Sequence, residues 1–198
     1  EEYESLFPGK FDYIPLRDDA DYLYRPEDLI QLAGRKLHGK RNHLAQFNRS
    51  YQWTYEEVSR ENFKDCMAVA HEWCLKHGNC GEDGHSEENC AVAAALHGFE
   101  PLGMKGGLIR IEGKPVAFTV GEEINPRCFV IHFEKAVDGY NGLYAAINHE
   151  FAANALSGYE YINREEDMGI EGLRKAKLSY QPAILLEKYM AVPKGETL

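Results

Sequence analysis

Apolar side chains recur every three or four residues through much of the first half of the chain, a pattern typical of amphipathic helices. The clearest helix is predicted over Ser59–His77, with its first serine as the N-terminal cap. An alanine-rich helix is predicted over Ser86–His97, after a polar, glycine-containing loop at Asn79–Ser86. A further helical stripe runs through Arg35–Tyr51, downstream of a proline-containing helix start at Arg25–Asp28.

Alternating apolar and polar residues in the second half of the chain predict strands. Gly107–Glu112 and Pro115–Glu122 are joined by a tight glycine turn and predict a β-hairpin. Phe11–Tyr24 alternates weakly and predicts one or two short strands. The remaining strands are Cys128–Ala136, Tyr159–Arg164 and Ala183–Val192, with helices at Gly142–Leu156 and Ile170–Tyr180. This order predicts an α/β (α+β) domain whose mixed sheet is flanked by helices and contains a central strand-helix-strand crossover.

The composition is typical of a soluble globular protein, because 44% of the 198 residues are hydrophobic and 27% are charged. The length suits one large domain, or one domain with an appendage. No run of about eighteen apolar residues occurs, so no membrane-spanning segment is predicted. The acidic amino terminus is unlike a secretory signal and lacks an initiator Met, as in a fragment of a longer protein. The odd count of five cysteines predicts free thiols without a disulfide framework, and hence a cytoplasmic location.

One segment departs from the acidic average of the chain, whose formal net charge is −10. Between Leu29 and Tyr55 there is no acidic residue, and aromatic side chains accompany the basic ones. Basic and aromatic residues together suit the end of a tRNA or a phosphorylated donor, whereas the alternative is a solvated helix face. The basic residues are Arg35, Lys36, Lys40, Arg41 and Arg49.

The densest group of charges follows the predicted strand Tyr159–Arg164 and continues onto the next predicted helix. A strand that ends in charged residues and leads into a helix is a common way to build a site. The charged residues are Arg164, Glu165, Glu166, Asp167, Arg174, Lys175 and Lys177. They predict either a reactive site or an ion-pair network on the surface.

Two other motifs favour structural readings. The turn Lys135–Gly142 lacks the glycine spacing of a coenzyme A pyrophosphate loop, and Asp138 would repel phosphate, so a helix-entry loop is predicted. A group of histidines and cysteines recurs every three residues. On a helix this spacing turns successive side chains to different directions, so they do not meet at one point. We therefore predict no metal site at these residues, which are His71, Cys74, His77, Cys80, His85 and Cys90.

Four strings of the sequence are similar to an uncharacterised bacterial family grouped with the C-terminal domain of phosphatidylglycerol lysyltransferase, within the GNAT-like acyltransferases. The similarity extends from about Tyr22 to Tyr189. The strings are Gly34–Phe47, Gly98–Glu122, Phe129–Ala136 and Asn163–Pro182. Members of this family often carry two GNAT-like units in tandem, which implies that residues 1–25 end a preceding unit or form a linker. The GNAT-like domain would then cover 26–192, followed by a tail at 193–198.

The resemblance implies a GNAT-like sheet in which two neighbouring parallel strands diverge, here Cys128–Ala136 and Tyr159–Arg164. Ionisable residues at their ends would share one cleft and could act in acyl transfer. As base or oxyanion-stabilising residues we expect Glu134, Glu165, Glu166 and Lys175. As substrate-binding residues we expect Lys135, Asn163, Arg164, Asp167, Arg174, Lys177, Arg35, Lys36, Lys40 and Arg41.

The expected activity is therefore transfer of an acyl or aminoacyl group to an amine or hydroxyl. The donor would be aminoacyl-tRNA or an acyl-CoA thioester, and no other cofactor is expected. The acceptor would be a small molecule, a lipid headgroup or a peptide. The alternatives are an acetyl-CoA-dependent N-acetyltransferase and a non-catalytic ligand-binding or scaffold domain that keeps the fold.

Overall fold

A computed structural model describes residues 2–77 and 87–195 of the chain. They form a seven-stranded sheet with the strand order β2-β3-β4-β5-β6-β1-β7. The strands are β1 (Phe11–Tyr24), β2 (Trp53–Glu57), β3 (Lys105–Ile111), β4 (Lys114–Asn125), β5 (Cys128–Ala136), β6 (Tyr161–Asn163) and β7 (Ile184–Pro193). This mixed sheet confirms the predicted fold class.

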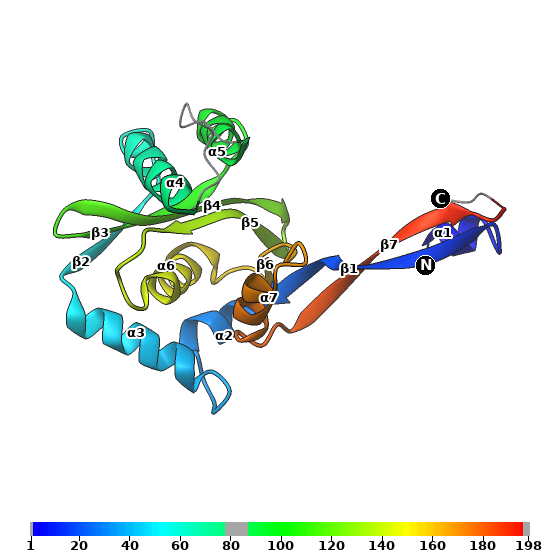
Figure 1. Cartoon of the computed structure of the whole chain (residues 1–198), viewed down its shortest axis with the longest axis horizontal. Coiled ribbons are helices and arrows are strands. Elements are labelled where there is room, and N and C mark those ends of the chain that lie inside the picture. The colour runs from blue at the N-terminus through cyan, green and yellow to red at the C-terminus, as the bar shows by residue number, and fades with distance from the viewer. Residues whose placement is uncertain (1, 78–86, 196–198) are drawn as a thin grey trace.

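Helices cover both faces of the sheet (Figure 1). Helices α4 and α5 lie on one face, whereas α6 lies on the other, with α2 and α3 beyond it. The helices are α1 (Glu2–Leu6), α2 (Pro26–Gln31), α3 (His38–Ser50), α4 (Phe63–His77), α5 (Glu87–His97), α6 (Leu143–Phe151) and α7 (Glu171–Leu178). Helix α6 continues as one π-helical turn, Ala152–Leu156, before the chain returns to β6.

The crossover β5-α6-β6 produces a parallel strand pair, as the sequence predicted. This pairing is short, because it ends at the register pair Val130↔Asn163 while β5 continues to Ala136. Beyond this point β5 and the chain that follows β6 part, because the Arg164 amide donates to the Tyr22 carbonyl of β1 at 3.0 Å while β5 continues. On its other edge β5 carries one extra residue opposite β4, His132, since Val120 pairs with Phe133 and the next β4 residue pairs with Ile131. Such a bulge bends the strand and re-aims its side chains.

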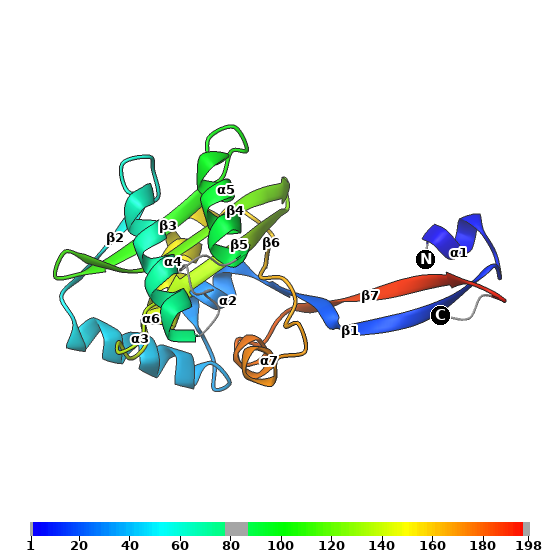
Figure 2. The same ribbon diagram turned by 45° about the horizontal axis from the view of Figure 1, so that its top comes forward.

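Strand β1 pairs with β7 along most of its length, from Phe11↔Pro193 to Leu23↔Ile184. Its inner end also pairs with β6 on the other side, at Leu23↔Asn163. The outer part and β7 project from the domain as a two-stranded arm, with α1 near its tip (Figure 2). The segment expected to be one or two short strands is thus one strand of 14 residues. The domain boundary expected after residue 25 stays a prediction.

The observed elements differ from the predicted ones mainly at their ends. Helix α4 begins four residues after the predicted cap, because Asn62 accepts the Ser59 amide at 2.9 Å and closes a turn ahead of the helix. Strand β2 was missed by the sequence reading. It has five residues and forms the outer edge of the sheet, where only β3 pairs with it among the described strands. The predicted loop Asn79–Ser86 lies outside the described residues.

Candidate active site

Glu134 and Arg164 form an ion pair where β5 and β6 part. Glu134 stands four residues beyond the last parallel register pair on β5, and Arg164 directly follows β6. The Nη2 atom of Arg164 donates to Oε1 of Glu134 at 2.7 Å, and both side chains are only 11–12% exposed. The Nδ2 atom of Asn148, a buried residue of α6, lies 3.4 Å from Oε2 of the same carboxylate. The crossover thus supplies all three polar groups.

A basic and aromatic layer closes over this pair. The guanidinium of Arg164 lies 5.0 Å from the ring centre of Tyr180 and 5.7 Å from that of Tyr24. The Nζ atom of Lys40, from α3, lies 3.9 Å from the ring centre of Tyr180. Burial, followed by the positive charge of Arg164, lowers the pKa of Lys40 to about 8. Lys40 is therefore the residue by which the basic segment reaches the Glu134–Arg164 pair.

Two buried polar atoms in this group have no partner among the described residues. They are Nη1 of Arg164, a donor, and Oδ1 of Asn148, an acceptor. Leaving a buried polar group unpaired costs about 1–3 kcal/mol, so nearly all such atoms in native proteins are paired. An unpaired donor and an unpaired acceptor beside one carboxylate would be satisfied by a ligand that carries both an acceptor and a donor.

Glu165 makes a different contact from Glu134. Its Oε1 atom lies 2.8 Å from Nδ1 of His132, whose Nε2 lies 3.1 Å from Oε1 of Glu122. Ionised carboxylates only accept hydrogen bonds, so both contacts are satisfied together when the imidazole carries two protons. The bond to Glu165, opposed by burial and helped by Glu122, raises the pKa of His132. Glu165 itself has φ of +56°, an uncommon backbone conformation for a residue with a side chain.

The His132 contacts predict a specific pH dependence of stability. Because its pKa is raised in the folded protein, His132 stabilises the fold below its unfolded pKa of about 6.5, and this contribution is lost as the pH rises through the folded pKa. The His132→Asn variant should therefore lose the decline in the free energy of unfolding that the wild type shows over this range. Urea unfolding between pH 5.5 and 9 measures it, and parallel profiles for both proteins would contradict the assignment.

Asp167 and Lys177 hold the loop after β6 in place. Asp167 is fully buried and accepts hydrogen bonds from Tyr22 at 2.5 Å and from Arg174 at 2.7 and 2.8 Å. The bonds from Arg174, opposed by burial and helped by Tyr22, keep the pKa of Asp167 well below its usual range. The Nζ atom of Lys177 donates to the backbone carbonyl oxygens of residues 164 and 165 at 2.7 and 3.1 Å, and to that of Glu166. Burial lowers the pKa of Lys177 to about 8.

The other expected site residues are dispersed. Lys175, Arg35 and Lys36 are exposed to solvent. Three more have partners of their own. Arg41 donates to the carbonyl oxygens that end α2 and the following turn, Glu166 lies 3.6 Å from Lys188, and Lys135 pairs with Glu88. Asn163 donates to Asp21 and accepts from the amide of Glu165, so it shapes the turn. Of the expected set, the structure brings Lys40, Glu134 and Arg164 together.

The sequence reading missed Asn148, Tyr24 and Tyr180. The available signal for Asn148 was a polar residue beside the apolar stripe of the predicted helix Gly142–Leu156. The two tyrosines lie at element ends far from Arg164 in sequence, and only the pairing of β1 with β6 and the return of the chain after α7 bring them to it.

The structure describes some of the histidines and cysteines that recur every three residues. Cys74 is buried and disulfide-bonded, so the expectation of free thiols is wrong for this residue. Cys66, Cys90 and Cys128 are free. Cys80 and His85 lie outside the described residues.

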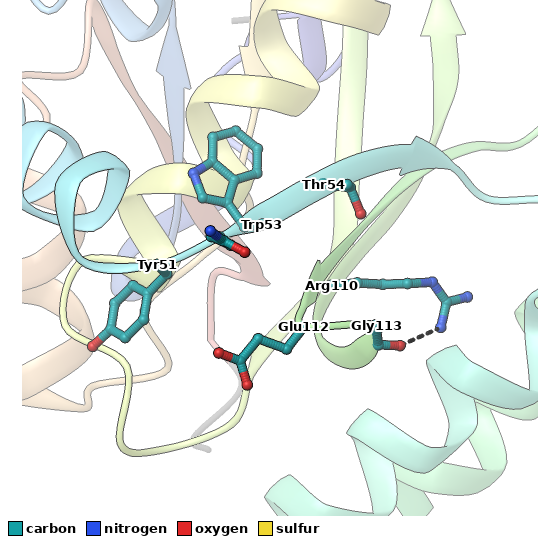
Figure 3. Close-up of a pocket in the computed structure, with 7 residues that line it drawn as sticks. Tyr51, Trp53, Thr54, Arg110, Glu112 and Gly113 are labelled. Atoms are coloured by element: carbon teal, nitrogen blue, oxygen red, sulfur yellow. Dashed lines mark hydrogen bonds between the residues drawn. The ribbon is translucent and has the colours of Figure 1, made fainter.

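An open pocket of about 410 Å³ lies elsewhere, at the β2–β3 edge of the sheet (Figure 3). Tyr51, Trp53, Arg110 and Glu112 contribute to its wall. Arg110 points away from Glu112, and its guanidinium is held by Glu56 and Asp65 at 2.7 and 2.5 Å. The guanidinium in the pocket wall is therefore paired with two carboxylates, whereas Arg164 beside Glu134 keeps Nη1 unpaired among the described residues.

Comparison with known proteins identifies the family. Residues 1–192 match the family described as phosphatidylglycerol lysyltransferase, C-terminal. The chain belongs to this family. A crystal structure of a conserved protein of unknown function from Bacteroides thetaiotaomicron is 44% identical, with a TM-score of 0.90 over 98% of this chain and 66% of that one. An uncharacterized protein of Mycoplasmoides gallisepticum is 25% identical over 92% of this chain. The chain spans 59% of the length of that relative.

More distant structures share the fold alone. The structure of L-PGS from Bacillus licheniformis is 18% identical, with a TM-score of 0.67 over 99% of this chain and 65% of that one. A tandem GNAT protein from the clavulanic acid biosynthesis pathway is 8% identical, with a TM-score of 0.51. These likenesses show that the chain has the GNAT-like fold. Within the described residues, no helix combines the length and the apolar character needed to cross a bilayer.

Proposed function

We propose that this domain transfers an aminoacyl group to an amine or hydroxyl acceptor at the Glu134–Arg164 pair. The observation that carries the proposal is the buried guanidinium of Arg164, which keeps one donor unpaired at the point where β5 and β6 part. In this role Arg164 and Lys40 donate to the carbonyl oxygen as negative charge develops on it. Glu134 takes the proton of the attacking amine or hydroxyl as its bond to the carbonyl carbon forms. The ester C–O bond of the donor then breaks, and the released oxygen takes up a proton from solvent.

The two unpaired atoms support an aminoacyl donor over a simple acyl donor. An aminoacyl group carries an ammonium beside its carbonyl, whereas an acetyl group carries only the carbonyl. Asn148 Oδ1 could accept from that ammonium while Arg164 Nη1 donates to the carbonyl oxygen, so both atoms would be satisfied at once. A site that hydrogen-bonds a polar substrate group rejects analogues that lack it, because its own atoms would remain unpaired.

The position of Lys40 suits a donor with a phosphate backbone. Exposed Arg35 and Lys36 precede it in the same acid-free segment. These side chains could contact the phosphates of a tRNA end whose aminoacyl group reaches Arg164. Because the unpaired atoms are buried, entry of the group requires Lys40 to move from the ring of Tyr180. The acceptor remains a small molecule, a lipid headgroup or a peptide.

The test of this function is a transfer assay with the full-length protein. The donors would be a set of aminoacyl-tRNAs and, separately, acetyl-CoA; the acceptors would be phosphatidylglycerol vesicles and small amines. We expect transfer from at least one aminoacyl-tRNA and none from acetyl-CoA. Acetyl transfer alone would favour an N-acetyltransferase, and tRNA binding without any transfer would favour a scaffold; either result contradicts the proposal.

Lys40 offers a prediction for the same assay. The Lys40→Met change keeps the aliphatic stem over Tyr180 and removes the charged donor, so kcat/KM should fall by about a hundredfold, the scale for one oxyanion donor. The matched control is Lys64→Met, which alters an exposed lysine of α4. Equal rates for the two variants would remove Lys40 from the site.

A further inference from the structure

A row of polar side chains runs from Glu134 across the sheet beneath α6. In the sheet register Glu134 pairs with Thr119 of β4, and Thr119 pairs with Gly107 of β3. Side chains of directly paired residues point to the same face, and here that face is the one where Asn148 of α6 approaches Glu134. Helix α6 contacts β3, β4 and β5, so it covers the whole row.

The next member of the row is the hydroxyl of Tyr55, from the edge strand β2. A Cβ atom added to Gly107 would lie 2.5 Å from the Tyr55 ring and 2.7 Å from its hydroxyl oxygen. Only glycine therefore leaves room for Tyr55 to extend over β3 toward Thr119. The row is thus Tyr55 OH, Thr119 Oγ1 and the carboxylate of Glu134.

Both hydroxyls are buried, and neither has a hydrogen-bond partner among the described residues. Thr119 is fully buried. Together with Arg164 Nη1 and Asn148 Oδ1, four of the five unpaired buried side-chain atoms found in the described part of the chain lie along this row or at its inner end. Buried polar atoms that lack protein partners are typically paired with ordered water, so a line of ordered waters would explain why these atoms lie along one row.

The outer end of the row reaches an exposed carboxylate near the surface. Glu57 of β2 pairs with Gly107 in the sheet register, and it is exposed. Burial, and then the charge of Glu57, raise the pKa of the Tyr55 phenol. A proton that reached Glu57 could therefore exchange with solvent.

We propose that ordered waters occupy the gaps of this row and connect Glu134 with Glu57. Side chains on adjacent strands are about 5 Å apart, a gap that one water can bridge with two hydrogen bonds. The inference rests on the proposed function: the waters carry away the proton that Glu134 takes from the acceptor. Each water and hydroxyl accepts one proton and releases one, Glu57 or bulk water receives the last, and Glu134 returns to its ionised form for the next turnover. The tRNA oxygen released as the ester bond breaks takes up one proton from solvent, so the transfer consumes and releases equal numbers of protons.

The presence of the waters can be tested without the transfer assay. Thr119→Val and Tyr55→Phe each remove a hydroxyl with little change of shape. If the hydroxyls are hydrated, each variant loses hydrogen bonds and its Tm falls; if they are unpaired and dry, removing them raises Tm or leaves it unchanged. We also expect the double variant to lose less Tm than the two single losses combined, because the hydroxyls share water. Thr54→Val, at an exposed position of β2, is the control.

The proton path is tested in the transfer assay. In both single variants kcat should fall by about tenfold or more while KM stays constant, and the D₂O solvent isotope effect on kcat should rise. If the full-length wild-type protein shows no transfer, the proposed function and the proton path are both overturned. The Tm values of the single and double variants still show whether ordered waters bind the two hydroxyls. If the variants transfer with the kcat of the wild type, the proton path is overturned. If their Tm values are higher or unchanged, the proposal that waters occupy the row is overturned.

Discussion

Replacing Glu134 by Gln should lower kcat/KM for transfer by about 10²–10⁴-fold, the range for loss of a positioned base. The amide keeps the size of the carboxylate, and its oxygen can still accept the 2.7 Å hydrogen bond from Arg164. The variant therefore removes the proton acceptor with little change of geometry. Transfer kinetics measure the effect, and a Tm close to that of the wild type shows that the loss is chemical.

A matched control for this variant is Glu160→Gln. Glu160 forms an exposed ion pair with Arg127 at 2.6 Å and stands outside the Glu134 group. Loss of an exposed pair changes stability little and should leave transfer unaffected. If Glu134→Gln lowers Tm sharply and the remaining folded protein keeps its full rate, Glu134 serves the fold alone, as the scaffold alternative requires.

Replacing Asp167 by Asn should lower the free energy of unfolding by about 3 kcal/mol, because it breaks a buried ionic network, leaves Arg17 without its anion and leaves Arg174 with Asp18 alone. The pKa of Asp167 is lowered in the fold, so its contribution is present above the unfolded pKa of about 3.9 and is lost as the pH falls through the folded pKa. Urea unfolding at pH 7 should show the full difference from the wild type, and the difference should narrow in acid.

Asp19→Asn is the control for Asp167, since Asp19 is an exposed carboxylate on the same arm strand, β1. We expect a change within about 0.5 kcal/mol there. An Asp167 variant as stable as the Asp19 variant would mean that the network adds little to stability. A large loss would explain why the loop that carries Arg164 keeps its shape, because Asp167 joins that loop to Tyr22 and Arg174.

The sequence predicted the position of site residues best where charged residues follow a strand with a clear apolar pattern. Glu134 and Arg164 were expected at the ends of the two parallel strands, and the crossover brings them into contact; their roles stay predictions. Glu165 was expected to share a cleft with Glu134, but it contacts His132 instead, because the bulge at His132 gives it a partner on β5. A bulge changes which face a side chain points to, and residue order does not reveal it.

Sequence alone could not rank the basic residues. Lys36 and Lys40 are four residues apart, which on one helix would place them on one face. Helix α3 begins at His38, however, so Lys36 lies in the preceding turn and is exposed while Lys40 packs on Tyr180. Strand β2 was missed for a related reason: five residues at a sheet edge gain most of their order from pairing with β3, a tertiary effect.

The most direct test is a crystal structure of the full-length protein with a stable aminoacyl-adenosine analogue that carries an amide in place of the ester. We predict its carbonyl oxygen within hydrogen-bonding distance of Arg164 Nη1 and its ammonium beside Asn148 Oδ1 and Glu134, with Lys40 displaced from Tyr180. An analogue bound instead in the Tyr51–Arg110 pocket, with the Glu134–Arg164 pair still covered, would contradict the account.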